Sequence, residues 1–289
     1  KTNSTSGYLG GLVGQDKAGS TYTDCHNTGM FNIPGSGRTM FIGGIVGGAL
    51  INTKGSLTNC SNSGKFEFNF SNKPDSGMFG GLVGSAEKAF WNFTDCTNEG
   101  NFSVTFADPG HQYHSLGGIL GNGYGTFVRC INKGDITFGT AKGTNYRRTG
   151  GIIGCVGAND DAIDFQRTLS MSDCRNEGDV SCGLGENTRN SARGIQAAGI
   201  VGFVNGNEAV SADVRDCVNT GRVRSESGRA AGICGFASYC DFDGNENLGT
   251  VEGGGALLGG IVVAVLGELA AAALLRTLHV PDDVFPQAL

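Results

Sequence analysis

The chain has 289 residues, a formal net charge of −6, and 51 glycines against only 5 prolines. Glycine without proline or a strict three-residue period excludes a collagen-like chain, and a hydrophobic content of 39% is too high for a disordered one. Basic residues cluster only at Arg147–Arg148, which argues against a nucleic-acid partner. We therefore expect a folded chain in which glycine serves repeated turns.

The first recurring block is Gly-Gly followed by two apolar residues and glycine, with alanine replacing the first glycine in two copies. The copies lie at Gly10–Gly14, Gly43–Gly47, Gly80–Gly84, Gly117–Gly121, Gly150–Gly154, Ala198–Gly202 and Ala231–Gly235, with a degenerate eighth from Gly259. Such self-similarity indicates a repeat architecture, in which each unit buries its apolar face against its neighbours.

The second block is Cys-x-Asn-x-Gly-x-apolar, and it alternates with the first along the chain. Its cysteines are Cys25, Cys60, Cys96, Cys130, Cys174 and Cys217, and its asparagines are Asn27, Asn62, Asn98, Asn132, Asn176, Asn219 and Asn247. In the seventh copy we place Asp243 in the cysteine slot and Cys240 in the apolar slot that precedes it. Successive cysteines lie 34 to 44 residues apart, so one repeat spans about 35 residues plus insertions.

Each repeat predicts at least two short strands. One strand carries the Gly-Gly block. The other follows Asn-x-Gly, where alternation such as Phe66-Glu67-Phe68-Asn69-Phe70 indicates a strand with one buried face. The glycine of Asn-x-Gly is predicted to take a positive φ and turn the chain. Stacked in register at about 4.8 Å per coil, the repeats predict an all-β fold, a parallel β-solenoid (β-helix) of about seven to eight coils.

These two blocks resemble the GLUG-motif repeat family, named for its Gly-Leu-apolar-Gly signature. The likeness runs from Gly10 to about Val263, nearly the whole chain. The resemblance implies a β-solenoid in an extracellular setting, as in adhesins, large cell-envelope proteins and non-catalytic parts of secreted peptidases. It implies no particular ligand, and the family brings no catalytic motif.

Both columns of the second block have structural explanations. Stacked coils would bring the six cysteines into a row of small buried hydrophobes, because in-register side chains that point the same way suit packing better than disulfide geometry. The asparagine amides can bond turn backbone or each other along the stack. No nucleophile motif accompanies any histidine, so we expect no enzyme and no cofactor. Because some β-helices act on polysaccharides, a carbohydrate-binding or carbohydrate-active β-helix stays the alternative.

Two further sets of residues are candidate sites. Asp241, Asp243, Asn245 and Glu252 echo the spacing of a calcium loop, although the glycine that such a loop needs is replaced by Glu246. We therefore predict no metal site and keep this calcium site as the weaker alternative. Asn69 and Asn101 begin Asn-x-Ser sequons and fall on the outward phase of their strands, so both are predicted glycosylation sites in a secreted protein.

The two ends of the repeat array differ. Residues 1–263 form the predicted solenoid. Residues 264–289 are set apart as an apolar helix, about Ala264–Leu278, and a tail. The apolar stretch Gly255–Leu275 predicts either a helix that caps the open core or a membrane span, and we favour the cap because Glu268 interrupts it.

The N-terminal end has no comparable cap. Only nine residues precede Gly10, so we predict that another protein subunit, or a longer parent chain, stacks on the N-terminal coil. Together these features predict a non-catalytic structural or adhesive module of an extracellular or cell-surface protein or filament. It would act through protein–protein assembly, with glycans as additional partners.

Overall fold

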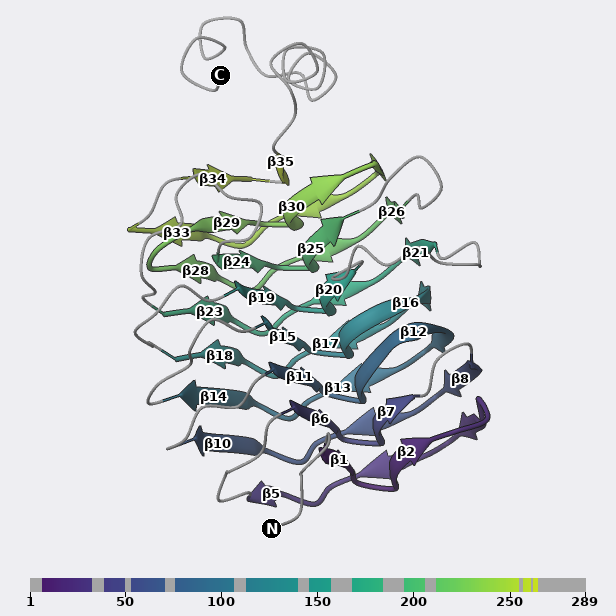
Figure 1. Cartoon of the computed structure of the whole chain (residues 1–289). Coiled ribbons are helices and arrows are strands. Elements are labelled where there is room, and N and C mark those ends of the chain that lie inside the picture. Colours follow the sequence, from purple (N-terminus) through teal and green to yellow (C-terminus); the bar gives the residue numbers. More distant parts are fainter. Residues whose placement is uncertain are drawn as a thin grey trace, which may run out of the picture.

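The computed structural model describes residues 7–32, 39–49, 53–70, 76–106, 113–139, 146–156, 168–183, 195–205, 212–254, 257–260 and 262–264. Within these ranges the protein is all-β, with 35 strands and no helix. Figure 1 shows the strands lying one above another like rungs, from β1 near the N-terminus to β35. Neighbouring strands pair in parallel, as the pairs β1–β6, β10–β14 and β13–β17 illustrate.

The strands form four sheets. Sheet I contains β1 (Gly7–Gly10), β6 (Thr39–Gly43), β11 (Ser76–Gly80), β15 (Tyr113–Gly117), β19 (Tyr146–Gly150), β24 (Ile195–Ala198), β29 (Arg229–Ala231) and β34 (Leu257–Gly259). Sheet II contains β2 (Val13–Asp16), β7 (Val46–Ala49), β12 (Val83–Thr94), β16 (Leu120–Val128), β20 (Ile153–Val156), β25 (Val201–Asn205), β30 (Cys234–Ser238) and β35 (Val262–Ala264), with β3 (Thr21–Thr23), β8 (Lys54–Thr58), β21 (Leu169–Ser172), β26 (Ala212–Arg215) and β31 (Cys240–Asp243).

The two remaining sheets have seven strands each. Sheet III contains β4 (His26–Asn27), β9 (Ser61–Asn62), β13 (Thr97–Asn98), β17 (Ile131–Asn132), β22 (Arg175–Asn176), β27 (Val218–Asn219) and β32 (Glu246–Asn247). Sheet IV contains β5 (Phe31–Asn32), β10 (Phe66–Phe70), β14 (Phe102–Phe106), β18 (Ile136–Phe138), β23 (Val180–Cys182), β28 (Val223–Ser225) and β33 (Val251–Gly253).

One coil passes through sheets I, II, III and IV in turn, so coil 1 comprises β1 to β5 and coil 2 comprises β6 to β10. Seven coils contribute to all four sheets, and β34 and β35 begin an eighth. Equivalent residues stack in columns, as Phe31, Phe66 and Phe102 do in sheet IV. The predicted parallel β-solenoid of seven to eight coils is confirmed.

The Gly-Gly block forms the corner between sheets I and II, so placing it inside a strand was wrong. In coil 2, Gly43 ends β6, and the chain bends at Gly44 and Ile45 before β7 begins. A Cβ on Gly44 would meet the carbonyl oxygen of Gly81 in the next coil and the amide of Asn62 in its own coil. The corner needs glycine because two neighbours approach its backbone too closely for a side chain.

Two main apolar clusters fill the solenoid. One lies behind sheet II and contains the buried cysteines of the column together with Trp91, Phe93 and Phe127. The other lies between sheets I and IV and contains Phe66, Phe79 and Phe102 among others. Aromatic rings stack from coil to coil, with ring centroids 4.0 Å apart for Phe66 and Phe102. Each buried phenylalanine stabilises the fold by roughly 1.5–3 kcal/mol, so the stack of coils, not the single coil, is the stable unit.

The left-handed turn of each coil lies one residue before the cysteine slot. Asp24, Asn59, Asp95, Arg129, Asp173 and Asp216 there have φ of 50–55°, and Gly244 has φ of 63° in coil 7. Asparagine and aspartate tolerate this conformation better than other residues with a side chain. The predicted positive φ at the glycine of Asn-x-Gly was wrong. A Cβ on Gly64 would instead meet the carbonyl oxygen of Gly29, so this glycine permits close stacking.

The seventh copy of the second block is shifted from its predicted assignment. The strand register pairs Val214 with Phe242 and Asn219 with Asn247. Asn245 therefore takes the cysteine slot beside Cys217, and Phe242, not Cys240, takes the apolar slot. Placing Asp243 in the cysteine slot was wrong because the block must be counted back from the asparagine, the residue that every copy shares.

Most of the C-terminal segment lies outside the described residues, which end at Ala264 in β35. This includes nearly all of the predicted helix Ala264–Leu278 and most of Gly255–Leu275. Within the described part of the chain, no helix combines the length and hydropathy that crossing a membrane would require. The choice between cap and span stays a prediction.

Candidate functional site: the outer face and the coil edges

The cysteine column lines the cluster behind sheet II. Cys60, Cys96, Cys130, Cys174 and Cys217 are buried as predicted, whereas Cys25 in coil 1 is only half-buried because no described coil lies beneath it. All ten cysteines of the chain are free thiols in this structure. Burial raises the pKa of the Cys130 thiol well above its ordinary value. From Cys60 to Cys217 the thiols lie inside the apolar cluster, and no group of candidate metal ligands among the described residues includes them, so the column is a packing feature.

Each thiol in the column also donates a hydrogen bond to a carbonyl oxygen in the turn that precedes it. Cys96 Sγ donates to the carbonyl oxygen of Thr94 in its own coil, at 3.4 Å, and to that of Leu57 in the coil beneath, at 3.5 Å. Cys60 and Cys130 make the equivalent pairs of contacts. Cysteine suits the slot because it is small and apolar yet carries a weak donor for these carbonyl groups.

The asparagine column forms a continuous hydrogen-bonded ladder. Asn98 Nδ2 donates to the carbonyl oxygen of Gly100 at 2.9 Å and to Asn132 Oδ1 in the next coil at 2.8 Å. The same donation to the next asparagine occurs at Asn27, Asn62, Asn132, Asn176 and Asn219, which ends on Asn247. From Asn62 to Asn219 the side chains are fully buried. The prediction that these amides bond turn backbone and each other is confirmed.

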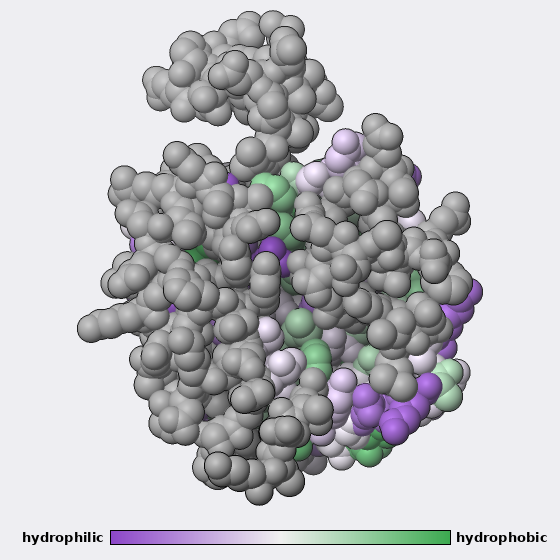
Figure 2. All heavy atoms as spheres, viewed as in Figure 1, coloured by the Kyte–Doolittle hydropathy of each residue, from purple (hydrophilic) through white to green (hydrophobic). Residues whose placement is uncertain are grey.

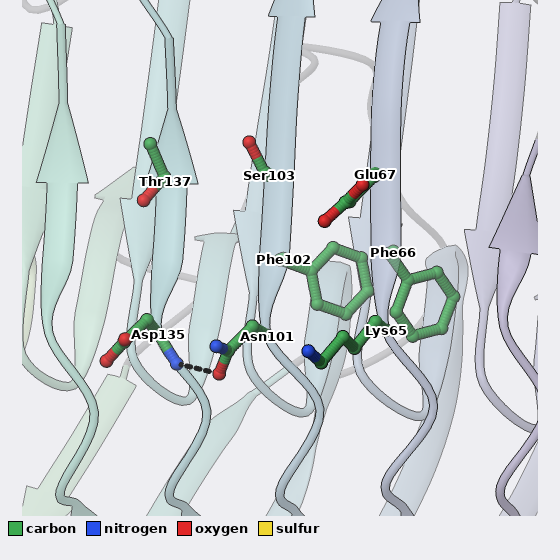
Figure 3. Close-up of a pocket in the computed structure, with 8 residues that line it drawn as sticks. All are labelled: Lys65, Phe66, Glu67, Asn101, Phe102, Ser103, Asp135 and Thr137. Atoms are coloured by element: carbon green, nitrogen blue, oxygen red, sulfur yellow. Dashed lines mark hydrogen bonds between the residues drawn. The ribbon is translucent and has the colours of Figure 1, made fainter.

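The outer face of sheet IV carries a shallow depression of about 210 Å³ across coils 2 to 4. Figure 3 shows its polar lining as two rows, Lys65, Asn101 and Asp135 at the strand starts, then Glu67, Ser103 and Thr137 along the strands. Asn101 Oδ1 accepts a hydrogen bond from the Asp135 amide at 3.0 Å, and Asp135 Oδ1 accepts one from the Asp179 amide at 2.9 Å. The first row thus ties neighbouring coils together.

The two predicted glycosylation sites lie on this same face. The side chains of Asn69 in β10 and Asn101 just before β14 are exposed, as the alternation predicted. The hydrogen bond from the Asp135 amide goes to Oδ1 of Asn101, so it does not involve Nδ2 (Figure 3). A glycan on Nδ2 would therefore leave this inter-coil hydrogen bond intact, and glycosylation itself stays a prediction.

The weak calcium candidate is not assembled. Asp241 and Asp243 lie on β31 in sheet II, whereas Glu252 lies on β33 in sheet IV, 3.9 Å from the guanidinium group of Arg222. The side chain of Asn245 bonds to coil 6. Its Oδ1 accepts a hydrogen bond from the Cys217 amide at 3.0 Å, and its Nδ2 donates one to the Val214 carbonyl oxygen at 2.7 Å. Across the described ranges, no group of three or more acidic, histidine or cysteine residues could hold a metal ion.

A buried arginine between sheets I and IV was missed by the sequence analysis. Arg147 is fully buried, and its Nη1 donates to the carbonyl oxygens of Gly139 at 3.4 Å and Gly183 at 3.5 Å. Its guanidinium carbon lies 5.1 Å from the centroid of the Phe138 ring, and burial lowers its pKa. The one signal in the sequence was its place three residues before the Gly-Gly block, which apolar Met40 and Ile195 take in other repeats. It holds the ends of β18 and β23 together.

Both ends of the solenoid present strands paired on one side only. Among the described residues, β1 to β5 pair only with coil 2. At the opposite end, β34 and β35 pair only with coil 7, and β31, β32 and β33 pair only with coil 6. The exposed large hydrophobic residues among those described all belong to the end coils, namely Leu12, Met30, Tyr239, Leu248 and Leu258. On the face visible in Figure 2, hydrophilic side chains gather at the lower right, where Figure 1 places β2 and β8.

At the N-terminal edge, some backbone amides lack the carbonyl partners that the equivalent amides of interior coils have in the described structure. The amides of Ser61 and Ser63 donate to the carbonyl oxygens of Cys25 and Asn27 in the coil beneath. In coil 1, His26 and Thr28 take these slots, and the described chain places no coil beneath them. A Cβ on Gly29 would meet only Asn27 Oδ1, at 3.4 Å. At this position, glycine is therefore required only when another coil lies below.

Comparison with known proteins yields no further assignment, since no family model, curated protein or solved structure matches the chain. The resemblance to GLUG-motif repeats therefore rests on the two sequence blocks alone.

Proposed function

We propose that the chain is a non-catalytic structural or adhesive module of an extracellular or cell-surface protein or filament, and that it acts through assembly at its coil edges. The N-terminal edge supports this most directly. Within the part of the chain that the structure describes, five strands there pair on one side only, and such edges pair readily with further strands. The resemblance of the two blocks to GLUG-motif repeats supports the same setting.

The residues of coil 1 suit coverage by another coil. His26 and Thr28 stand at positions whose amides, in interior coils, donate hydrogen bonds to carbonyl oxygens of the coil beneath. Position 29 is a glycine, although coil 1 without a coil beneath it has room for a side chain there. Leu12 and Met30 are 50% and 68% exposed. A coil beneath would pair the amides, crowd Gly29 and bury part of this apolar surface.

Hydrogen exchange in the native assembly tests this proposal. Amides of His26 and Thr28 should exchange slowly there, and quickly in the dissociated chain. The Leu12 and Val13 amides serve as an internal reference, because both already bond to the Ile45 carbonyl oxygen of coil 2. If His26 and Thr28 exchange in the native assembly as fast as a frayed end, the edge is open and the proposal fails.

An extracellular location makes its own prediction. In material from a eukaryotic secretory source, Asn101 or Asn69 should carry a glycan, because both side chains are exposed on sheet IV. Peptide mass spectrometry with and without glycosidase treatment measures this directly. Unmodified Asn69 and Asn101 in such material would count against a secretory route.

The polar depression on sheet IV supports the alternative, a carbohydrate-binding β-helix. Its lining of Lys65, Glu67, Asn101 and Asp135 offers donors and acceptors that suit sugar hydroxyl groups. Binding of the intact chain to a glycan array, compared with that of a Glu67→Ala and Asp135→Ala double variant, tests this. Loss of binding in the variant would favour the alternative, and no binding by either chain would leave assembly as the function.

A further inference from the structure

The outer face of sheet II carries two straight columns of polar residues on β3, β8, β12, β16 and β21, one strand from each of coils 1 to 5. The strand register is unbroken at these positions. The first column contains Thr21, Ser56, Asn92, Thr126 and Ser170, and the second contains Thr23, Thr58, Thr94, Val128 and Ser172. Every member is exposed or partly exposed. We call these ten residues the hydroxyl lattice, because eight of them are serine or threonine.

The hydroxyl lattice carries no charge, although charged side chains are among those most often exposed. Charges begin where it ends. In coils 6 and 7 the same two positions hold Asp213 and Arg215, then Asp241 and Asp243. Asp213 and Arg215 form an ion pair at 2.7 Å. The uncharged surface of coils 1 to 5 is therefore a feature of those coils and not of the strand position.

The hydroxyl lattice has a rigid backing. Between its two columns, Leu57, Phe93 and Phe127 point inward and are fully buried. The rings of Phe93 and Phe127 stack from coil to coil with centroids 4.6 Å apart. On the outer face, Ser56 Oγ donates to Thr21 Oγ1 in the neighbouring coil at 3.3 Å. The β-branched threonines are restricted in χ1, so little rotamer freedom is lost when a ligand binds them.

The spacing of the hydroxyl lattice follows from sheet geometry. Neighbouring strands lie about 4.8 Å apart, and residues i and i+2 on one face of a strand lie about 6.7 Å apart. Oxygen positions repeat at similar distances along two perpendicular directions on the prism faces of hexagonal ice. Water molecules that bridge neighbouring hydroxyl groups would therefore lie close to positions of that crystal.

We propose that the hydroxyl lattice binds the surface of ice. Its hydroxyl groups both donate to and accept from water molecules, and it has no charge that would orient the water differently. Each hydroxyl group contributes little by itself, so binding depends on several coils acting together. A polysaccharide is a poorer fit, because the lattice has no aromatic ring or charged group to orient a sugar. The lattice lies on the side of the solenoid, so this proposal is independent of assembly at the coil edges.

Ice affinity of the intact chain tests this. Ice grown slowly in a dilute solution of the chain should incorporate wild type and exclude an unrelated globular protein. Thr126→Lys should lower the incorporated fraction about tenfold, because a charge in the middle of the lattice loses its hydration against ice. Thr58→Lys, at a more exposed position of the other column, should have the same effect.

Thr137→Lys is the matched control. Thr137 is an exposed threonine of the same coil as Thr126, but it lies on the outer face of sheet IV. This variant carries the same added charge and should be incorporated like wild type. All three side chains point toward solvent, so the melting temperatures of the variants should equal that of wild type.

A wild-type chain that ice excludes would overturn the inference. Thr126→Lys and Thr58→Lys chains that ice takes up like wild type would overturn it as well, as would an equal loss in Thr137→Lys. Binding to insoluble cellulose or chitin that Thr126→Lys abolishes, without uptake into ice, would assign the lattice to a polysaccharide instead. None of these outcomes affects the exchange of the His26 and Thr28 amides, which tests the proposed function separately.

Discussion

Coil 3 and coil 1 carry the same motif, but its residues meet different surroundings. Cys96 and Asn98 of coil 3 are fully buried between two coils, whereas Cys25 and Asn27 of coil 1 are half-buried with a neighbour on one side. A Cβ on Gly100 would meet the Gly64 carbonyl oxygen, whereas one on Gly29 would meet only Asn27. The comparison teaches that each motif residue matters through the coil on either side of it, so identical substitutions should have unequal costs.

The largest difference is expected for the asparagine column. Asn98→Ala removes the acceptor for Asn62 Nδ2, at 2.9 Å, and the donor to Asn132 Oδ1, at 2.8 Å. The Gly100 carbonyl oxygen loses its donor as well, so three buried polar groups lose partners, and we expect the free energy of unfolding to fall by about 2–5 kcal/mol. Asn27→Ala leaves only one such group and should cost about 1 kcal/mol. Urea unfolding of both variants measures this, and equal losses would refute the comparison.

The glycines of Asn-x-Gly should separate next. Gly100→Ala forces a Cβ against the Gly64 carbonyl oxygen and should lower the free energy of unfolding by about 1–3 kcal/mol, as overpacking does. Gly29→Ala meets only a contact at 3.4 Å and should be neutral, or stabilising by up to about 1 kcal/mol. Thermal melts of the dissociated chain report both effects. A destabilised Gly29→Ala chain would show that coil 1 is crowded by something other than a coil beneath.

Coil 1 has one stabilising feature of its own. Burial alone would raise the pKa of Asp16, but the amides of Ala18, Ser20 and Gly19 and the Tyr22 hydroxyl lower it from 3.8 to about 2. This contribution is present above pH 3.8 and is lost as the pH falls through about 2. We expect wild type to lose about 2 kcal/mol more than Asp16→Asn between pH 5 and pH 2. Urea unfolding across that range checks it, and parallel curves would contradict it.

The smallest difference is expected for the cysteines. Cys96→Ser buries a hydroxyl that keeps nearby carbonyl acceptors, so it should cost about 1–2 kcal/mol, while Cys25→Ser should stay within about 0.5 kcal/mol. Thiol labelling followed by mass spectrometry gives a second measure. Cys25 should label in the native state before any of the five buried cysteines of the column. Rapid labelling of Cys96 would show that the column opens without global unfolding.

Much of the fold could be predicted from the repeats, but the structural roles of several individual residues could not. The spacing of the two blocks was enough for the parallel solenoid and its coil number, and the asparagine ladder followed from stacking. The corner at Gly44 and the left-handed turn at Asp95 escaped, because both depend on which backbone atoms of the next coil come close. Arg147 escaped because its acceptors, Gly139 and Gly183, are neighbours only after the coils stack.

The amino-acid sequence by itself determined the repeat, its length and the columns that Cys96, Asn98 and Gly100 join, because periodicity is a property of the chain alone. Only the tertiary structure decided that Gly44 is a corner, that Asp95 is the left-handed residue and that Cys25 is half-buried. The physical reason is that these properties arise between coils. Each is set by carbonyl oxygens and side chains about 35 residues away, which come within contact distance only when one coil rests on the next.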